Sequence, residues 1–250
     1  MTLPDHDTTP SYVIIGATGG IGSTLSRRLA KQGARLVLAS RNLEKVSRLA
    51  EELGAIPHPL DARKPQDVQA CIENAVQRQT RIDGVVNLVG SMLLKPVHLI
   101  SEEEWHETMA LNVTSSYGVV RSAAKAMMKT GGSIVLMSSV AAKVGLHNHE
   151  AIAAAKGAVA GLAISAAATY ANKGIRINCV APGLVKTPLT EKLTSSEAAM
   201  KVSTAMHPLG RVGEPEDIAS AIEWFLSPNQ SWVTGQVLSV DGGMASVRPR

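Results

Sequence analysis

A lysine in an alanine-rich segment is the first residue of this chain that could take part in acid–base chemistry. Lys156 lies within residues 151–159, where the alanine content favours a helix. Residues four and seven positions apart share a helix face, so Ile152 and His149 lie on the face of Lys156. Isoleucine has no proton to donate, whereas histidine is suited to proton transfer near neutral pH. His149 is therefore a candidate acid or base.

A glycine-rich turn near the N-terminus has the composition of a phosphate-binding turn. Gly16, Gly20 and Gly22 follow an apolar run, and an amphipathic segment begins at about Ile21. Glycine permits the backbone angles of such a turn and lets the backbone approach a pyrophosphate, and the free N–H groups of the next helix attract the anion. A purely structural turn could also use glycine, but the order of strand, turn and helix favours a dinucleotide.

The end of the second predicted strand indicates which dinucleotide is bound. NAD-specific sites place a carboxylate there for the ribose 2′-hydroxyl, and residues 38–42 contain none. Ser40 and Arg41 instead offer a hydroxyl and a guanidinium, which suit a 2′-phosphate. The alternative is that Arg41 is a solvated residue at a helix start. We expect NADP(H) rather than NAD(H).

These motifs and those that follow them resemble the short-chain dehydrogenase/reductase family over nearly the whole chain. The resemblance rests on the glycine turn, Asp61, Asn87-Leu88-Val89-Gly90, Asn112, Ser138-Ser139, Lys156 and residues 182–187. The family's proton donor is a tyrosine four residues before the lysine, and this chain has Ile152 there. One branch, the enoyl-thioester reductases, has its tyrosine seven residues before the lysine, which is the position of His149.

The resemblance implies a role for each of these residues. Ser139 would polarise the substrate oxygen, and Lys156 would hold the nicotinamide ribose. Asn112 would break its helix and bind a water leading towards Lys156. With His149, the expected catalytic set is Asn112, Ser139, Lys156 and His149. The expected cofactor-binding set is Gly16, Thr18, Gly20, Ile21, Gly22, Ser40, Arg41, Asp61, Ala62, Asn87, Gly90, Lys156, Pro182, Gly183, Val185 and Thr187.

Simpler alternatives exist for the catalytic residues. Lys156 and Asn112 could face solvent, and a serine after a strand, such as Ser139, is commonly a turn former. His149 could be a loop or helix-start residue without a chemical role.

Short β-branched segments alternate with longer helical patterns along the chain. Strands are predicted at 12–15, 35–39, 56–60, 84–89, 133–137, 176–180 and 236–240, and helices at 21–32, 43–53, 65–79, 101–129, 150–172 and 215–226. The alternation predicts an α/β fold with parallel βαβ units, a single Rossmann-like doubly wound parallel sheet with helices on both faces. The expected strand order is 3-2-1-4-5-6-7. We expect one domain, with a flexible tail at 1–10 and a mobile substrate lid at 184–214.

Composition excludes several classes of function. The chain of 250 residues is 45% hydrophobic and 18% charged, as is ordinary for a soluble enzyme. The net charge of +4 is dispersed, which argues against nucleic acid, and Cys71 and Cys179 alone argue against a disulfide scaffold or zinc. We find no signal peptide and no uninterrupted apolar stretch of membrane-spanning length, so we expect a cytoplasmic protein without metal or membrane partners.

The sequence thus predicts an NADP(H)-dependent oxidoreductase. It would transfer hydride between nicotinamide and a small or medium carbonyl or alcohol, or an activated alkene, with His149 or a bound water as a nonstandard proton donor. Ile152 leaves the alternative of an NADP(H)-binding sensor or scaffold without turnover, whereas the intact Asn112, Ser139 and Lys156 favour an enzyme. The small side chains of 151–168 suit close helix packing, either within the domain or between subunits. The family that the chain resembles usually pairs this helix in dimers and tetramers, so we expect a homodimer or homotetramer.

Overall fold

The computed structural model describes residues 9–248, which contain one seven-stranded parallel sheet. The strands are β1 (Ser11–Ile15), β2 (Arg35–Ser40), β3 (Ile56–Pro59), β4 (Gly84–Asn87), β5 (Gly132–Met137), β6 (Ile175–Pro182) and β7 (Val237–Val240). Their order is β3-β2-β1-β4-β5-β6-β7, which confirms the predicted order. Residues 1–8 of the predicted tail lie outside the described residues.

The helices lie between the strands as predicted. They are α1 (Gly20–Lys31), α2 (Leu43–Leu53), α3 (Pro65–Gln79), α4 (Glu102–Met109), α5 (Ser115–Met127), α6 (Glu150–Tyr170), α7 (Glu191–Thr194), α8 (Glu197–Met206) and α9 (Pro215–Leu226). Single 3₁₀ turns occur at Val97–Leu99, Val140–Ala142, Ala171–Lys173, Pro188–Thr190 and Pro228–Gln230.

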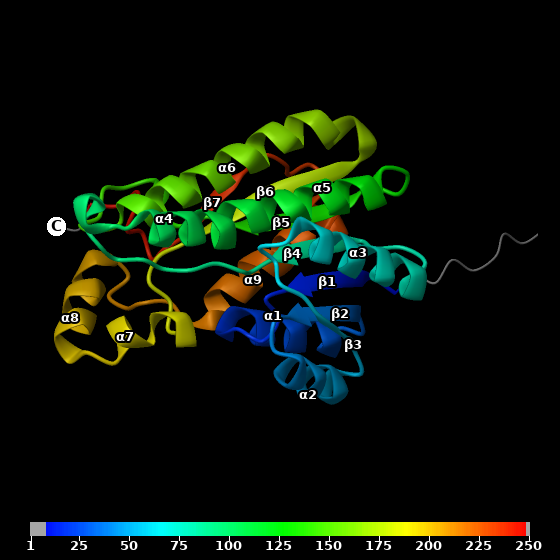
Figure 1. The fold of residues 1–250 in the computed structure, drawn as a ribbon, viewed down its shortest axis with the longest axis horizontal. Helices are drawn as coiled ribbons and strands as arrows, with labels where there is room; N and C mark the ends of the chain where they lie inside the picture. The colour runs from blue at the N-terminus through cyan, green and yellow to red at the C-terminus, as the bar shows by residue number, and fades with distance from the viewer. Residues whose placement is uncertain (1–8, 249–250) are drawn as a thin grey trace, which may run out of the picture.

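Two helical layers cover the sheet because successive strand residues point to opposite faces. Val13 and Ile15 of β1 pack towards α3, α5 and α6, whereas Tyr12 and Ile14 pack towards α1, α2 and α9. Figure 1 shows these two layers above and below the strands. With both faces covered, the strands are apolar without alternation, as expected for a parallel sheet.

The helix predicted at 101–129 is interrupted at Asn112, as the family resemblance implies. A π-helical turn at Ala110–Thr114 separates α4 from α5 and contains Asn112. The Asn112 side chain is fully buried, and its Nδ2 donates to the carbonyl oxygen of Thr108 at 2.8 Å. π-helical turns within α-helices frequently mark functional sites.

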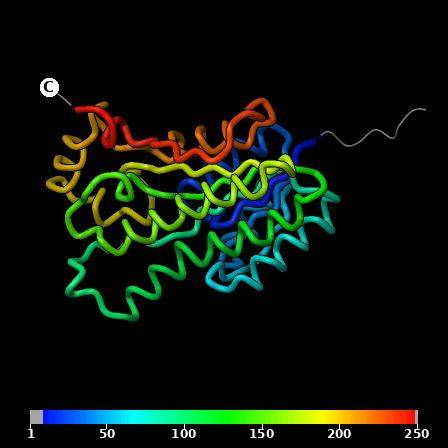
Figure 2. The backbone as a smooth tube through the Cα atoms, turned by 90° about the horizontal axis from the view of Figure 1, so that it is seen from above, coloured from blue at the N-terminus to red at the C-terminus, as the bar shows by residue number. Residues whose placement is uncertain are grey.

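The predicted lid, 184–214, contains two helices. Helices α7 and α8 project beyond the carboxyl ends of the strands, and α8 lies beside the C-terminal segment in both backbone views (Figures 1 and 2). The lid therefore stands at the edge of the sheet where the glycine turn also lies.

Helix α6 is a longer apolar segment than the sequence analysis expected. With its continuation to Lys173 it is long and apolar enough to cross a membrane by length and composition alone, and 44% of its most apolar window is buried. It packs against α4, α5, β5 and β6, and it directs Lys156 into the protein. These contacts are those of a core helix with one open face, on which Gly161 and Ile164 are exposed.

Candidate functional site

Two adjoining cavities lie at the carboxyl ends of β1, β4, β5 and β6. The cofactor cavity, about 220 Å³, is lined by the glycine turn, Gly90, Lys156 and residues 182–190 in part. The lid cavity, about 700 Å³, lies between the sheet and α8. Both cavities share the lining residues Met92, Ser139, Ile152, Gly183 and Thr190. Crevices at the carboxyl ends of strands are where ligands bind in open α/β sheets.

The glycine turn has no room for a side chain at Gly16 or Gly22. Gly16 has a φ of +89°, and a Cβ atom on Gly22 would collide with the carbonyl oxygen of Gly16. No side chain caps the N-terminus of α1, whose first N–H groups point to the turn. A turn of bare backbone at an uncapped helix N-terminus fits the pyrophosphate of a dinucleotide.

The loop after β6 lies against this turn. A Cβ atom on Gly20 would be 3.0 Å from Cγ2 of Thr187. Pro182, Gly183, Val185 and Thr187 all line the cofactor cavity. The structure therefore brings the residues predicted for the nicotinamide end together with those predicted for the pyrophosphate.

Lys156 points into the cofactor cavity rather than into solvent. Its side chain is 8% exposed, and Nζ donates to the carbonyl oxygen of Met137 at 2.9 Å. Ser138 donates its hydroxyl to the carbonyl oxygen of Lys156 at 2.9 Å, which fixes α6 on the end of β5. Burial lowers the pKa of Lys156 to about 8, because the desolvated ammonium is less stable than it is in water.

Asn112 and Lys156 meet at Gly90. A Cβ atom on Gly90 would lie 2.8 Å from Oδ1 of Asn112 and 3.2 Å from Nζ of Lys156. Nδ2 of Asn112 also donates to Oγ of Ser91 at 3.0 Å. Ser91 was not among the predicted residues, although it follows Gly90 directly. The π-helical turn and the glycine together let the amide approach the lysine.

The Asn87 side chain is used in hydrogen bonds within the fold. Its Nδ2 donates to the hydroxyls of Ser115 and Ser116, and its Oδ1 accepts from the N–H of Val89. Asn87 thus joins the end of β4 to the start of α5 and does not line the cofactor cavity.

Ser139 and Ile152 separate the two cavities. Oγ of Ser139 accepts from the N–H of Ala141 at 3.2 Å, which leaves its hydroxyl hydrogen available to a substrate oxygen. Ile152 is 4% exposed and presents only carbon atoms to both cavities.

His149 lines the lid cavity but not the cofactor cavity. Its Nδ1 is 2.7 Å from the carbonyl oxygen of His147. Because a carbonyl oxygen only accepts, Nδ1 carries the hydrogen, and Nε2 of the neutral ring is left as a proton acceptor. The ring is thereby oriented at the N-terminus of α6, one turn before Ile152.

The residues predicted to bind the adenosine half lie beyond the cofactor cavity. Arg41 is exposed at the end of β2, and Oγ of Ser40 donates to the carbonyl oxygen of Asn42 at 3.3 Å. The N–H of Gly16 donates to the carbonyl oxygen of Ala39 at 2.8 Å, which places the glycine turn beside Ser40 and Arg41.

Asp61 is engaged by a neighbouring guanidinium. Nη2 of Arg63 lies 2.6 Å from Oδ2 of Asp61, and hydrogen bonds from Arg63 lower the pKa of the Asp61 carboxyl. Arg63 also pairs with Glu107 at 2.9 Å. Ala62 is buried, and it and Thr18 do not line the cofactor cavity.

The sequence indicated the segments that form much of the lid cavity wall, residues 91–100 and 184–214, but not which of their side chains line it. No Asp, Glu, Lys or Arg occurs among the described residues that line it. The wall includes Met92, Leu94, Leu146, Leu193, Val202, Met206, His207 and Met244. Their side chains come from four separate segments, so no single motif could have indicated them.

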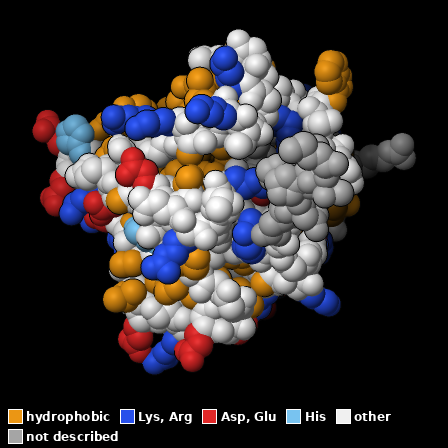
Figure 3. Space-filling model, turned by 90° about the vertical axis from the view of Figure 1, so that its right-hand side faces the viewer, with side chains coloured by type: hydrophobic (Ala, Val, Ile, Leu, Met, Phe, Trp, Pro, Cys, Tyr) orange, Lys and Arg blue, Asp and Glu red, His pale blue; other side chains and the backbone are white. Residues whose placement is uncertain are grey.

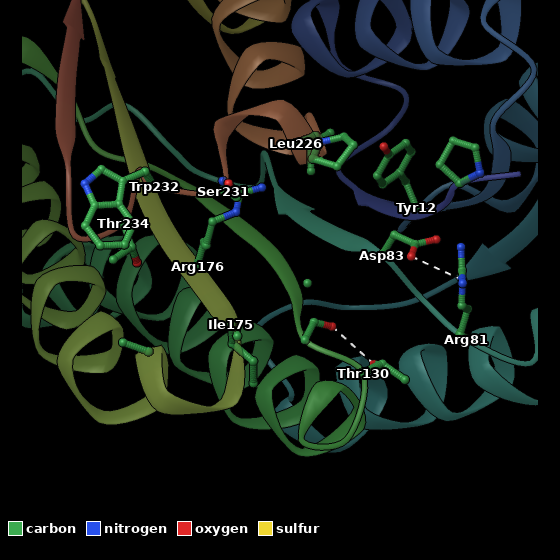
Figure 4. Close-up of a pocket in the computed structure, with 16 residues that line it drawn as sticks. Tyr12, Arg81, Asp83, Thr130, Ile175, Arg176, Leu226, Ser231, Trp232 and Thr234 are labelled. Atoms are coloured by element: carbon green, nitrogen blue, oxygen red, sulfur yellow. Dashed lines mark hydrogen bonds and ion pairs between the residues drawn. The ribbon is translucent and has the colours of Figure 1, made fainter. Parts of the chain in front are cut away.

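A larger cavity, about 810 Å³, lies at the opposite, amino-terminal edge of the sheet. Figure 4 shows Tyr12, Asp83 and Arg176 around it, and Arg176 donates to the carbonyl oxygens of Phe225 and Ser227. On that side of the molecule, Lys and Arg side chains are interspersed with uncharged surface (Figure 3). The cavity contains none of the residues predicted for catalysis.

Comparison with known proteins supports the assignment made from the geometry. The family model described as "Enoyl-(Acyl carrier protein) reductase" matches residues 16–245. The chain is 34% identical over 238 residues to a "3-oxoacyl-[acyl-carrier-protein] reductase" of Thermotoga maritima, covering 93% of this chain and 96% of the relative.

Solved structures of other proteins share the fold of this chain. A short-chain type dehydrogenase/reductase from Mycobacterium ulcerans is 31% identical with a TM-score of 0.92, covering 99% of this chain and 93% of that one. ElxO with NADP bound is 29% identical with a TM-score of 0.90, covering 96% and 100%. Sequence, sheet order and cavity position all lead to one assignment: this chain belongs to the short-chain dehydrogenase/reductase family.

Proposed function

We propose that this protein is an NADP(H)-dependent oxidoreductase that interconverts a small or medium carbonyl compound and its alcohol, with a proton donor other than residue 152. The observation that carries the proposal is the arrangement around Ser139, which borders the cofactor cavity on one side and the lid cavity on the other. A substrate in the lid cavity can therefore reach both Ser139 and the cofactor cavity. An activated alkene is the second substrate type that this arrangement suits.

Each residue of the site has a part in the reaction. NADPH, when bound, supplies the hydride. Ser139 donates a hydrogen bond to the substrate oxygen and stabilises the negative charge that develops there. Lys156 and Asn112 hold the ribose and a water at Gly90. The alkoxide takes a proton either from Nε2 of His149, when the ring is protonated there and so returns to its neutral form, or from a water, and becomes the alcohol.

The direct test of this function is NADPH consumption with a panel of ketones, quinones and enoyl thioesters. We expect turnover with at least one apolar ketone, because a chain that lacks one general acid loses about 10²–10⁴-fold and not all activity. Calorimetric binding of NADPH without turnover of any substrate would contradict the enzymatic role and support a sensor.

We predict that Arg41→Ala weakens NADPH binding about tenfold and leaves NADH binding nearly unchanged. A guanidinium at the end of β2 contributes a charge-assisted hydrogen bond to the 2′-phosphate, which NADH lacks. Dissociation constants measured by calorimetry for both nucleotides test this. ElxO, a structural relative, was solved with NADP bound, which supports the preference.

The matched control is Arg48→Ala. Arg48 lies on α2 and is paired with Glu44 at 2.5 Å. Its removal takes one positive charge from the same region without touching the predicted phosphate position. Equal losses of NADPH affinity in both variants would mean that Arg41 acts only through its positive charge and does not bind the 2′-phosphate directly.

We predict that His149→Ala lowers kcat about 10²-fold with little change in the KM of the substrate, because a positioned acid contributes about 10²–10⁴-fold. Initial rates with the best substrate of the panel provide the measurement. His147→Ala is the control, since His147 lines the same cavity and holds the His149 ring only through its backbone carbonyl. Unchanged turnover in His149→Ala would leave water as the proton source.

We also propose a homodimer or homotetramer in the cytoplasm. The open face of α6, with Gly161 and Ile164 exposed, supports subunit packing, because small residues let helices approach closely. Cys71 and Cys179 are free and buried, which is consistent with a reducing compartment.

A further inference from the structure

A buried histidine, His207, joins the end of α8 to the loop after β6. His207 is 3% exposed and directly follows α8, whose residues Val202 and Met206 line the lid cavity. Nδ1 of His207 lies 2.6 Å from the carbonyl oxygen of Ser203, and Nε2 accepts from the N–H of Leu184 at 3.2 Å. The ring therefore connects the last turn of α8 with the loop that lines the cofactor cavity.

The two hydrogen-bond partners of His207 determine which ring nitrogen carries the hydrogen. The carbonyl of Ser203 only accepts, so Nδ1 carries the hydrogen, and the N–H of Leu184 only donates, so Nε2 is bare. His207 is thus held as a neutral imidazole with both nitrogens used. His207 also lines a second, small cavity together with Asp241, Arg211 and Asp217, and Arg211 is paired with Asp217 at 2.6 Å.

The surrounding backbone is shaped around this ring. A Cβ atom on Gly183 would lie 2.5 Å from Nε2 of His207, and one on Gly242 would lie 3.5 Å from its Cβ. The N–H of Gly183 donates to the carbonyl oxygen of Val240, and that of Leu209 donates to Gly242. Three segments therefore converge on His207: the end of α8, the loop after β6 and the C-terminal segment.

From this arrangement we infer that His207 is a positioning residue that couples nucleotide binding to closure of the lid over the substrate. The inference rests on the proposed function, since it takes residues 183–187 as the nicotinamide-binding loop. A nucleotide that orders this loop fixes the N–H of Leu184, which in turn fixes the ring and the end of α8. By linkage, the substrate then favours nucleotide binding to the same extent.

The test uses three variants of the full chain. His207→Leu removes both hydrogen bonds. His207→Asn can still donate towards Ser203 but is too short to reach Leu184, whereas His207→Gln places an acceptor oxygen near the position of Nε2. Protection of the lid is read by limited trypsin digestion, with mass spectrometry following cleavage after Lys192 on α7 and Lys201 on α8.

We expect NADPH to slow cleavage at these two lysines about tenfold in the wild-type protein and in His207→Gln, and not in His207→Leu or His207→Asn. In turnover, the substrate KM of His207→Asn rises about tenfold while kcat stays within about threefold. Equal protection of His207→Asn and the wild type would overturn the inference, as would equal losses in His207→Gln and His207→Asn. Failure of the proposed function has a different signature, namely a wild-type protein to which NADPH does not bind.

Discussion

Replacing Ile152 with tyrosine is expected to raise the kcat of ketone reduction about 10²-fold or more, because a positioned general acid contributes about 10²–10⁴-fold. Residue 152 lies one turn before Lys156, and its side chain borders both cavities beside Ser139. A phenol in this place would lie within the field of a buried ammonium, which lowers the pKa of a phenol and favours proton transfer. Initial rates of NADPH oxidation with one ketone measure the effect.

Ile152→Phe is the matched control for this prediction. Phenylalanine has the bulk of tyrosine without its hydroxyl, so it reproduces any change in packing or in cavity volume. An equal gain in kcat in both variants would mean that the size of the side chain, and not the hydroxyl, causes the effect. A folded Ile152→Tyr protein that binds NADPH without faster turnover would show that residue 152 does not stand at the proton-transfer position.

Replacing Lys156 with methionine is expected to abolish most turnover and to stabilise the fold at neutral pH by about 2 kcal/mol. Burial lowers the pKa of Lys156 from 10.5 to about 8, and each factor of ten in proton affinity is worth about 1.4 kcal/mol. Keeping the ammonium buried therefore costs about 3 kcal/mol, which the lost hydrogen bond to Met137 offsets in part. Urea unfolding of both proteins provides the free energies of unfolding.

The free-energy cost of burying the Lys156 ammonium depends on pH. Between about pH 8 and 10.5 the unfolded chain holds the Lys156 proton and the folded chain does not, so wild-type stability from this group rises with pH. The cost is complete below pH 8 and disappears above 10.5. The stability advantage of Lys156→Met should therefore shrink as the pH is raised through this interval. A constant difference would mean that the ammonium is well solvated in the folded protein.

The sequence predicted the sheet because its evidence is local. Each strand is a short β-branched run, and the alternation with helices leaves few topologies for a parallel sheet. Helices α2, α3 and α9 begin and end where predicted, since Pro65 and Pro215 at the first helical position and Gly54 after α2 mark their ends. Gly22 was equally local, because a Cβ atom there would meet the backbone of Gly16 and Ala17, whereas Gly16 and Gly20 are confined by Leu88 and Thr187, which lie far away in the chain.

The parts of the site that depend on distant contacts were less predictable. Asparagine is a mediocre helix former, so the sequence marked Asn112 as a weak point of the helix, but the bonds of its buried amide to Thr108 and Ser91 are seen only in the folded structure. His207 gave only a weak signal, a lone histidine in the lid segment four residues after Ser203. Its bond to Leu184 joins residues 23 positions apart. The wall of the lid cavity likewise assembles only when four segments fold together.

The uncharged wall of the lid cavity has a consequence for the choice of substrate. An ion that enters must give up its shell of hydrating water, and an isolated charge removed from water without a compensating partner is costly. No Asp, Glu, Lys or Arg is present among the described residues of the wall to supply a permanent opposite charge. The cost of dehydration would thus disfavour the binding of carboxylates, phosphates and ammonium compounds, even those small enough to fit the cavity.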